Sequence, residues 1–239
     1  MRTRPSGSLA RCALALALGA GLAALGCGDG KVRLPSGPGQ PGTAVVILID
    51  TSGSMAQDVS DRGAFRPKHQ IAREALERII QNTGRWRKDN PNKPLQLAIY
   101  NFSSSVSELL PMGDFDEAKA RAALARLPSP NSGTAIGTAI EHGYQALYQS
   151  GYHRKFLLCI TDGENTAGTP PERVARQLHL QTKGEVKMYF IAFDIAANKF
   201  RFVKEVGGEV VEASNGDQLQ AHLANIYEKK ILAEAEEPQ

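Results

Sequence analysis

The sequence predicts an α/β protein with a doubly wound, mostly parallel central sheet of about six strands flanked by helices. Residues 44–49 (AVVILI) form a continuous, largely β-branched apolar run, which is typical of a parallel strand buried on both faces. Later runs of this kind alternate with segments of helical periodicity, as in βαβ units. The composition, 42% hydrophobic and 22% charged residues, is ordinary for a globular chain and excludes wholesale disorder.

The expected elements follow one another along the chain. They are a helix through 71–80, strands at 95–102 and 106–110 joined as a hairpin through Ser103-Ser104-Ser105, a helix at 115–127 with Asp114 as its N-cap, and a helix through 136–147. There follow a strand at 155–160, a helix at 170–180, a strand at 186–193, a helix at 199–206 closed by Gly207-Gly208, a strand at 209–212 and an amphipathic helix at 219–232. Residues 233–239 form an acidic tail that we expect to fray.

The first 27 residues have the pattern of a bacterial signal peptide. Three arginines flank an apolar run, residues 12–25, that is short for a membrane span of about 20 residues. The run ends at residues 24–27 (ALGC), which resembles the lipobox of bacterial lipoproteins, so Cys27 is the expected lipidation site. Gly28 follows instead of Asp, which favours the outer membrane over the inner membrane of the cell envelope. A plain secretory signal is the alternative, and it would leave the protein secreted or periplasmic.

The region after the signal is a linker and then a neutral domain. Residues 28–42 are rich in Pro and Gly and predict a flexible tether. The chain has 28 Lys and Arg against 25 Asp and Glu, but three of the basic residues lie in the signal, which has no acidic residue. The remaining chain is therefore neutral and shows no basic stripe, which argues against a nucleic-acid partner. Cys159, within an apolar run, is expected to be buried and unreactive.

Polar clusters lie where a doubly wound sheet would bring them together. Residues 50–55 (DTSGSM) follow the first strand, residues 132–134 (SGT) precede a helix, and residues 161–164 (TDGE) follow the strand at 155–160. Ligands bind at the carboxyl ends of the strands in such sheets. The clusters offer carboxylates and hydroxyls but no His or Cys, and this hard-oxygen set suits Mg²⁺.

These motifs resemble the metal-ion-dependent adhesion site of the von Willebrand factor type A (VWA) domain. The resemblance is carried by DxSxS at 50–54, SGT at 132–134 and TDG at 161–163, and it covers residues 43–232. It implies that two serines and a threonine contact a divalent ion, Mg²⁺ with Mn²⁺ or Ca²⁺ as alternatives, and that two aspartates often bind through water. The implied metal ligands are Asp50, Ser52, Ser54, Thr134 and Asp162.

Two points qualify the resemblance. Residues 57–68 (QDVSDRGAFRPK) depart from the family's pattern, because they lengthen the loop beside the implied metal. Ser52, Ser54 and Thr134 have an alternative role as helix N-caps, and Asp162-Gly163 as a plain turn.

The leading functional hypothesis is a divalent-metal-dependent protein-binding module anchored to the bacterial envelope. An Asp or Glu carboxylate of a partner protein would complete the metal's coordination shell. The alternatives are a scaffold whose metal stabilises loops and, less favoured, a metal-assisted hydrolase. The chain lacks G-x-S-x-G, Walker A and zincin motifs, and no histidine stands beside Ser52 or Ser54 in the sequence. We therefore expect a protein that is not an enzyme.

Overall fold

A computed structural model of the chain describes residues 32–35 and 39–237. The strands are β1 (Gln40–Asp50), β2 (Asp58–Asp61), β3 (Ala64–Pro67), β4 (Leu95–Phe102), β5 (Val106–Asp114), β6 (Tyr152–Thr161), β7 (Val186–Phe193) and β8 (Glu209–Ala213). The α-helices are α1 (Lys68–Asp89), α2 (Glu117–Ala125), α3 (Ile136–Gln149), α4 (Pro171–Thr182), α5 (Arg201–Glu205), α6 (Gly216–Ile226) and α7 (Ala233–Glu236). Short 3-10 turns occupy Gly53–Ala56 and Ala197–Phe200, and a π-helical turn occupies Tyr227–Leu232.

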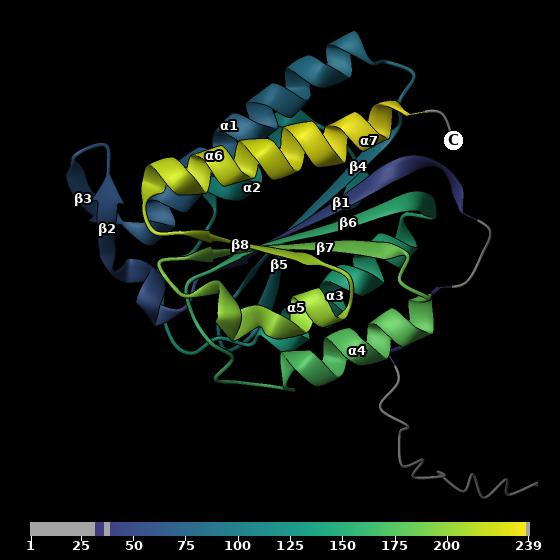
Figure 1. The fold of residues 1–239 in the computed structure, drawn as a ribbon. Helices are drawn as coiled ribbons and strands as arrows, with labels where there is room; N and C mark the ends of the chain where they lie inside the picture. The colour runs from purple at the N-terminus through teal and green to yellow at the C-terminus, as the bar shows by residue number, and fades with distance from the viewer. Residues whose placement is uncertain (1–31, 36–38, 238–239) are drawn as a thin grey trace, which may run out of the picture. The chain divides into compact units, whose positions relative to one another are not determined.

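The central sheet has six strands in the order β5-β4-β1-β6-β7-β8 (Figure 1). Neighbours pair in parallel except for the β4–β5 hairpin, which is antiparallel. The mostly parallel, helix-flanked α/β fold expected from the sequence is thus confirmed. The next two strands of the sheet along the chain, β4 and β5, lie on one side of β1, and the later strands β6, β7 and β8 lie on its other side. The strand order therefore reverses direction at β1. Ligands bind at such switch points in open α/β sheets.

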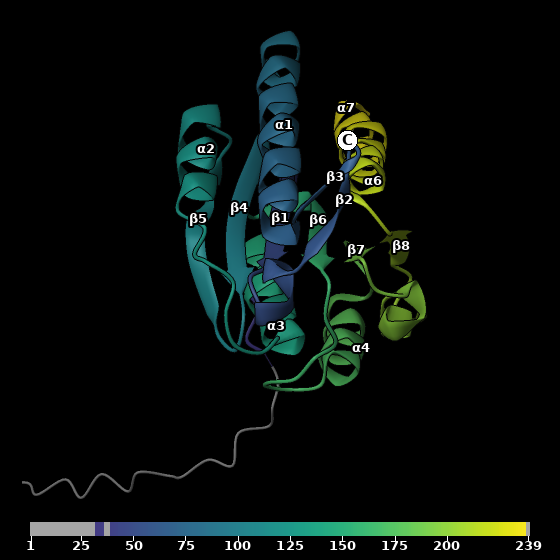
Figure 2. The same cartoon turned by 90° about the vertical axis from the view of Figure 1, so that its left-hand side faces the viewer.

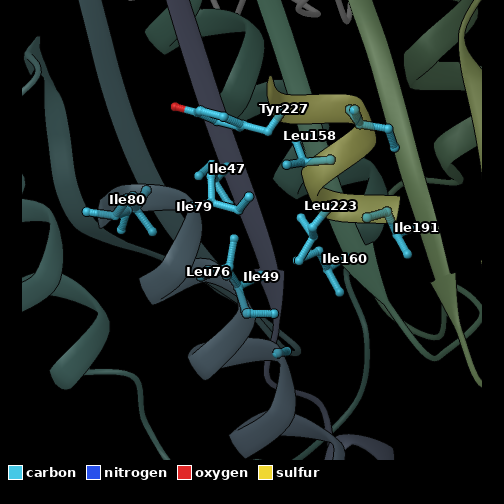
Figure 3. Packing of buried hydrophobic residues seen from close by; sticks show 14 of the residues in the cluster. Ile47, Ile49, Leu76, Ile79, Ile80, Leu158, Ile160, Ile191, Leu223 and Tyr227 are labelled. Atoms are coloured by element: carbon cyan, nitrogen blue, oxygen red, sulfur yellow. The ribbon is translucent and has the colours of Figure 1, made fainter. Parts of the chain in front are cut away.

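Helices cover both faces of the sheet. Figure 2 shows α1, α2 and α6 on one face, with α3 and α4 on the other. The apolar run of β1 supplies both cores, because successive side chains of a strand point to opposite faces. Val45, Ile47 and Ile49 pack towards α1 and α6, whereas Ala44, Val46 and Leu48 pack towards α3 and α4. Figure 3 shows Ile47 and Ile49 among the buried side chains of the first core.

The described parts of two segments expected to be loose pack against the domain. Val32 and Leu34, in the expected tether, are partly buried and pack against the core on the α3 and α4 face. At the other end, Ala233–Glu236 forms α7 instead of a frayed tail, and Trp86 Nε1 donates a hydrogen bond to Glu236 Oε1 over 2.7 Å. The physical reason in each case is contact with a distant part of the chain. Apolar contacts hold Val32 and Leu34, and a hydrogen bond holds Glu236.

Two expected details were wrong at the level of single elements. Asp114 ends β5, and the N-cap of α2 is Asp116, whose side chain accepts a hydrogen bond from the Lys119 N–H over 3.0 Å. The C-terminal helix is not one regular helix, since the π-helical turn separates α6 from α7. Cys159 is fully buried, as expected, and burial raises the pKa of its thiol.

The expected signal peptide, with Cys27, lies outside the described residues. Within the described part of the chain, no helix combines the length and the apolar character needed to cross a membrane.

Candidate metal centre

The three polar clusters meet at the carboxyl ends of β1 and β6. Residues 50–55 turn away from β1, and the segment beginning at Thr161 turns away from β6, its neighbour in the sheet. The loop before α3 lies beside both, because the N–H of Asn131 donates to Thr51 O over 2.9 Å and that of Gly53 to Ser132 O over 3.0 Å. Segments about 80 and 110 residues apart in the chain are in this way joined by backbone hydrogen bonds and strand pairing.

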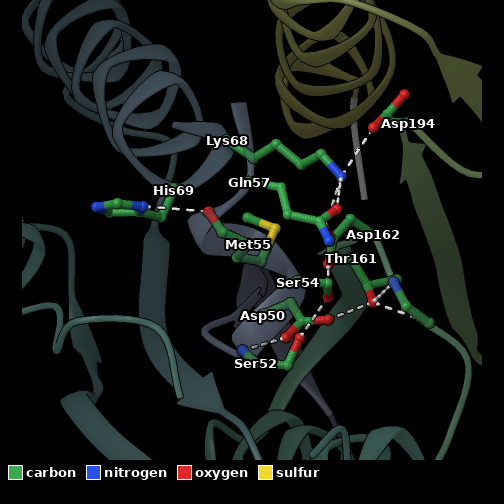
Figure 4. A network of polar contacts seen from close by, with 11 residues as sticks. Asp50, Ser52, Ser54, Met55, Gln57, Lys68, His69, Thr161, Asp162 and Asp194 are labelled. Carbon is green, nitrogen blue, oxygen red and sulfur yellow. Dashed lines mark hydrogen bonds and ion pairs between the residues drawn. The ribbon is translucent and has the colours of Figure 1, made fainter. Parts of the chain in front are cut away.

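Asp50 is a fully buried carboxylate at the end of β1 (Figure 4). Its Oδ1 accepts the Ser52 N–H over 2.7 Å, and its Oδ2 accepts the Thr161 hydroxyl over 2.5 Å. Burial raises the pKa of Asp50 to about 6, although the hydrogen bonds from Ser52 and Thr161 act in the opposite direction. A cation bound nearby would offset the cost of keeping this carboxylate charged in the interior.

Ser52, Ser54 and Asp162 form a chain of oxygen atoms next to Asp50. The hydroxyl oxygens of Ser52 and Ser54 lie 3.1 Å apart, and the Ser54 hydroxyl donates to Asp162 Oδ1 over 2.6 Å. Ser52 and Asp162 are buried. Because 108 residues separate Ser54 from Asp162, only the fold brings them together.

Thr134 approaches the same place from the loop before α3. Its N–H donates to the Thr166 hydroxyl over 2.8 Å, and its carbonyl accepts the Thr166 N–H over 2.8 Å. A methyl group added at Gly163 would lie 3.2 Å from Thr134 Oγ1 and 3.6 Å from Ser54 Oγ, so both hydroxyls border the same small space. A side chain at position 163 would take up part of that space.

The hydroxyls of Ser52 and Thr134 do not cap helices. Ser52 stands at the N-cap position of the turn Gly53–Ala56, but its side chain makes no capping hydrogen bond. The N-cap of α3 is Ala135 and not Thr134. The alternative role expected for Ser52 and Thr134 is therefore not realised, and their oxygens remain available to a ligand.

The oxygen spacing fits a six-coordinate ion. Mg²⁺ binds oxygens at 2.0–2.1 Å in an octahedron, which puts neighbouring ligand atoms about 3 Å apart. The 3.1 Å between the two serine hydroxyls and the 2.6 Å from Ser54 to Asp162 are close to this separation. Among the described residues, no three His, Cys, Asp or Glu side chains gather as metal ligands, so an ion here would depend on hydroxyl oxygens. The donor set therefore fits a hard divalent cation.

Two residues of the cluster were given no role from the sequence, although Thr161 stands within the TDG motif. Thr161, which binds Asp50, directly precedes Asp162 at the end of β6, and that position was an available signal. Lys68 is buried, and its Nζ lies 3.0 Å from Asp162 Oδ2 and 2.8 Å from Asp194 Oδ2. Burial lowers the pKa of Lys68, but the hydrogen bonds to Asp194 and Asp162 outweigh it and raise the pKa overall. No sequence signal pointed to Lys68, because it lies 94 residues from Asp162.

The other acidic residues considered near the site have different environments. Asp194 borders the site through its ion pair with Lys68. Glu164 pairs instead with Lys199 over 2.9 Å, and Asp58 is exposed.

A family model identifies the fold. The model described as "von Willebrand factor type A domain" matches residues 44–225. The chain belongs to this family. VWA domains typically serve as protein-interaction modules, some of them with a metal site.

Solved structures of low sequence identity share the VWA fold. A von Willebrand factor type A protein from Catenulispora acidiphila is 21% identical with a TM-score of 0.63, over 80% of this chain and 43% of the other. The PilB minor pilin from Streptococcus sanguinis is 16% identical with a TM-score of 0.67, over 85% and 65%. Proximal thread matrix protein 1 from the mussel byssus, "with zinc occupied MIDAS motif", is 20% identical with a TM-score of 0.59, over 82% and 46%.

The chain thus spans less than two thirds of the length of these three proteins. No curated protein matches it.

Proposed function

We propose that this VWA domain is a divalent-metal-dependent protein-binding module. The observation that carries the proposal is that the Ser52 and Ser54 hydroxyls and the Asp162 carboxylate lie at the spacing of metal ligands. The Thr134 hydroxyl borders the same small space beside Gly163. When bound, the ion supplies a Lewis-acidic position for one further oxygen ligand. A carboxylate is the natural candidate, because the two aspartates only neutralise a divalent ion and neutral hydroxyls fill the other positions.

The proposed ion is Mg²⁺, with Mn²⁺ and Ca²⁺ as alternatives. Mg²⁺ binds through one or two carboxylates and retains water at its other positions. The mussel relative carries zinc in its motif, which supports a divalent ion at this place without deciding which one this chain binds.

The proposed partner is a protein that presents an Asp or Glu side chain, and the proposed location is the bacterial cell envelope. Cys27 would carry the lipid anchor, with the outer membrane favoured over the inner one. Without acylation, the protein would be secreted or periplasmic. The neutral charge of the chain beyond the signal supports a partner other than nucleic acid.

We propose no enzymatic activity for this domain. A serine nucleophile needs a general base within hydrogen-bonding reach. In the described part of the chain, the Ser52 hydroxyl bonds to that of Ser54, and the Ser54 hydroxyl donates to Asp162. The nearby His69 contacts the backbone oxygen of Met55. A scaffold whose metal only stabilises the loops remains the competing function.

The experiment that tests the proposal is metal-dependent capture of envelope proteins. Full-length protein is immobilised and exposed to solubilised envelope proteins in Mg²⁺, in chelator, and in chelator followed by excess Mg²⁺. The S54A and T134A variants are compared with T182A, which removes a hydroxyl bonded to Leu178 O, far from the cluster in sequence. Circular dichroism verifies that each variant is folded.

We expect wild type and T182A to retain the same partner only while Mg²⁺ is present. S54A and T134A should lose it, and added salt should matter less than chelator, because the contact is a coordination bond and not a screened surface charge. Retention unaffected by chelator and by both substitutions would reject metal-mediated binding and leave the scaffold function.

A further inference from the structure

The least expected group at the candidate centre is a buried ammonium. The side chain of Lys68 is only 3% exposed, and its Nζ lies between the carboxylates of Asp162 and Asp194. Lys68 is the first residue of α1 and directly follows the β2–β3 hairpin. The residues that lengthen the loop after the DxSxS motif form this hairpin, in which β2 pairs with β3. The backbone N–H of Lys68 donates to Gln57 O over 2.9 Å and closes the hairpin at its base.

The two oxygens of Asp162 serve different partners, as Figure 4 shows. Oδ1 accepts the Ser54 hydroxyl, on the side of the candidate metal ligands, and Oδ2 accepts the Lys68 ammonium. An ion held by the hydroxyls would meet Oδ1, while Lys68 could stay on Oδ2. Lys68 therefore does not have to leave for a metal to bind, and its charge acts on the ion through a shared carboxylate.

Lys68 makes the surroundings of the candidate ion more positive. Asp50 and Asp162 alone balance a divalent charge, and the Lys68–Asp194 pair adds one charge of each sign. The Asp194 side chain is 44% exposed, so water screens its charge more than that of the buried Lys68. The remaining positive field opposes the binding of a divalent cation. The same field favours an anionic ligand on that cation once it is bound.

We infer that Lys68 sets the charge of the centre, so that the ion is bound less tightly but attracts a carboxylate more strongly. This inference rests on the proposed metal-dependent function. It assigns Lys68 a positioning and charge-setting role through Asp162, without direct contact with the metal.

The test compares Mn²⁺ affinity with acetate affinity in the full-length protein. The Mn²⁺ affinity is measured by electron paramagnetic resonance of the free ion. The acetate affinity is measured by the relaxation of the acetate methyl protons that protein-bound Mn²⁺ causes. In K68M we expect Mn²⁺ to bind at least about fivefold more tightly and acetate to bind more weakly, because one nearby positive charge is gone. In K68R, which retains the charge, both affinities should stay near wild type.

Two further variants distinguish the charge of Lys68 beside Asp162 from the loss of a positive charge elsewhere on the protein. K199M removes an equal charge that is paired with Glu164, two residues beyond Asp162, and its Mn²⁺ affinity should stay within about twofold of wild type. D194N leaves Lys68 in place but removes the negative charge of Asp194, which partly compensates the ammonium. The centre becomes more positive, so Mn²⁺ should bind more weakly. This variant keeps the inference testable if K68M does not fold.

The sign of the change decides between the roles. If Lys68 only held Asp162 in place, K68M would bind Mn²⁺ more weakly. Weaker or unchanged Mn²⁺ binding in K68M, or an equal gain in K199M, overturns the inference while the metal centre stands. Absence of Mn²⁺ binding to the wild-type protein would overturn the metal centre and this inference together.

Discussion

At the scale of single residues, the candidate centre consists of polar groups that satisfy one another. Asp50 accepts Ser52 and Thr161, and Ser54 donates to Asp162. Buried polar groups in such networks need all their partners, because an unpaired one costs about 1–3 kcal/mol. The spacing of the DxSxS, SGT and TDG motifs predicted which side chains would lie together. The contact of Lys68 with Asp162 could not be predicted, since it depends on how segments 94 residues apart pack.

The first prediction removes single hydroxyls. S54A and T134A should lower Mn²⁺ affinity by at least about tenfold, because each deletes one oxygen ligand and leaves a water in its place. Titration calorimetry on the folded variants measures the change, and T182A, whose hydroxyl bonds to Leu178 O, is the matched control. Wild-type affinity in both site variants would show that neither hydroxyl binds the ion.

At the scale of elements, the β2–β3 hairpin is the main addition to the predicted fold. Residues 57–68 were expected only to lengthen a loop, and no apolar alternation predicted strands there. Arg66 of β3 joins the hairpin to α1, because its Nη1 lies 3.1 Å from Glu74 Oε2 on that helix. The same Nη1 lies 2.8 Å from Asp61 Oδ2 in β2 and so also links the two strands. Phe65 in β3 is 78% exposed. The strands of the central sheet, in contrast, were predicted well because their apolar runs are long and buried on both faces.

The second prediction concerns this tie. R66M should speed amide hydrogen exchange in residues 58–67 a few-fold and leave the central sheet unchanged, because the ion pairs fix only the hairpin. The hydrogen bond from Arg66 lowers the pKa of Glu74 below its ordinary value of 4.5. The stabilisation from Glu74 is therefore present at neutral pH and is lost as the pH falls through that lowered pKa.

Arg85 supplies the control for this measurement. It also lies on α1, and it bonds to Asn82 on the same helix instead of to the hairpin. R85M should leave exchange in residues 58–67 as in wild type. Equal exchange in R66M and wild type would mean that contacts other than those of Arg66 hold the hairpin.

At the scale of the whole molecule, the cores on both faces of the sheet are built from side chains other than the candidate metal ligands. The VWA domain should therefore fold in chelator, unlike small domains whose metal supplies most of the folding free energy. The sequence was sufficient to predict this architecture. It could not predict that Val32 and Leu34 or residues 233–236 pack on the domain, because short segments carry too little pattern to show where they dock.

The third prediction is that the metal stabilises a domain that is already folded. An ion that binds only the folded state raises the free energy of unfolding by about 1.4 kcal/mol at ten times its Kd. Thermal unfolding in Mn²⁺ and in chelator measures this gain, and D50A should abolish it. An identical wild-type melting temperature in millimolar Mg²⁺, millimolar Mn²⁺ and chelator would argue against a working site.

The fourth prediction places the molecule in the cell. Mass spectrometry of the mature protein should find residue 27 as the N-terminus with its cysteine acylated, because stable anchoring requires more than one acyl chain and a lipoprotein cysteine carries them. C27S should release the protein from the membrane fraction. An unmodified N-terminus at another residue, in a freely soluble protein, would contradict the anchor and support a plain secretory signal.

The most direct test of the metal centre is crystallography of the protein grown in Mn²⁺. We predict an anomalous peak that places a manganese ion within bonding distance of the hydroxyls of Ser52, Ser54 and Thr134. Asp50 and Asp162 should bind this ion directly or through water. One coordination position should face solvent, either open or filled by water. Lys68 should remain on Asp162 Oδ2. A fully occupied manganese site elsewhere, or no peak at these hydroxyls at saturating Mn²⁺, would contradict the account.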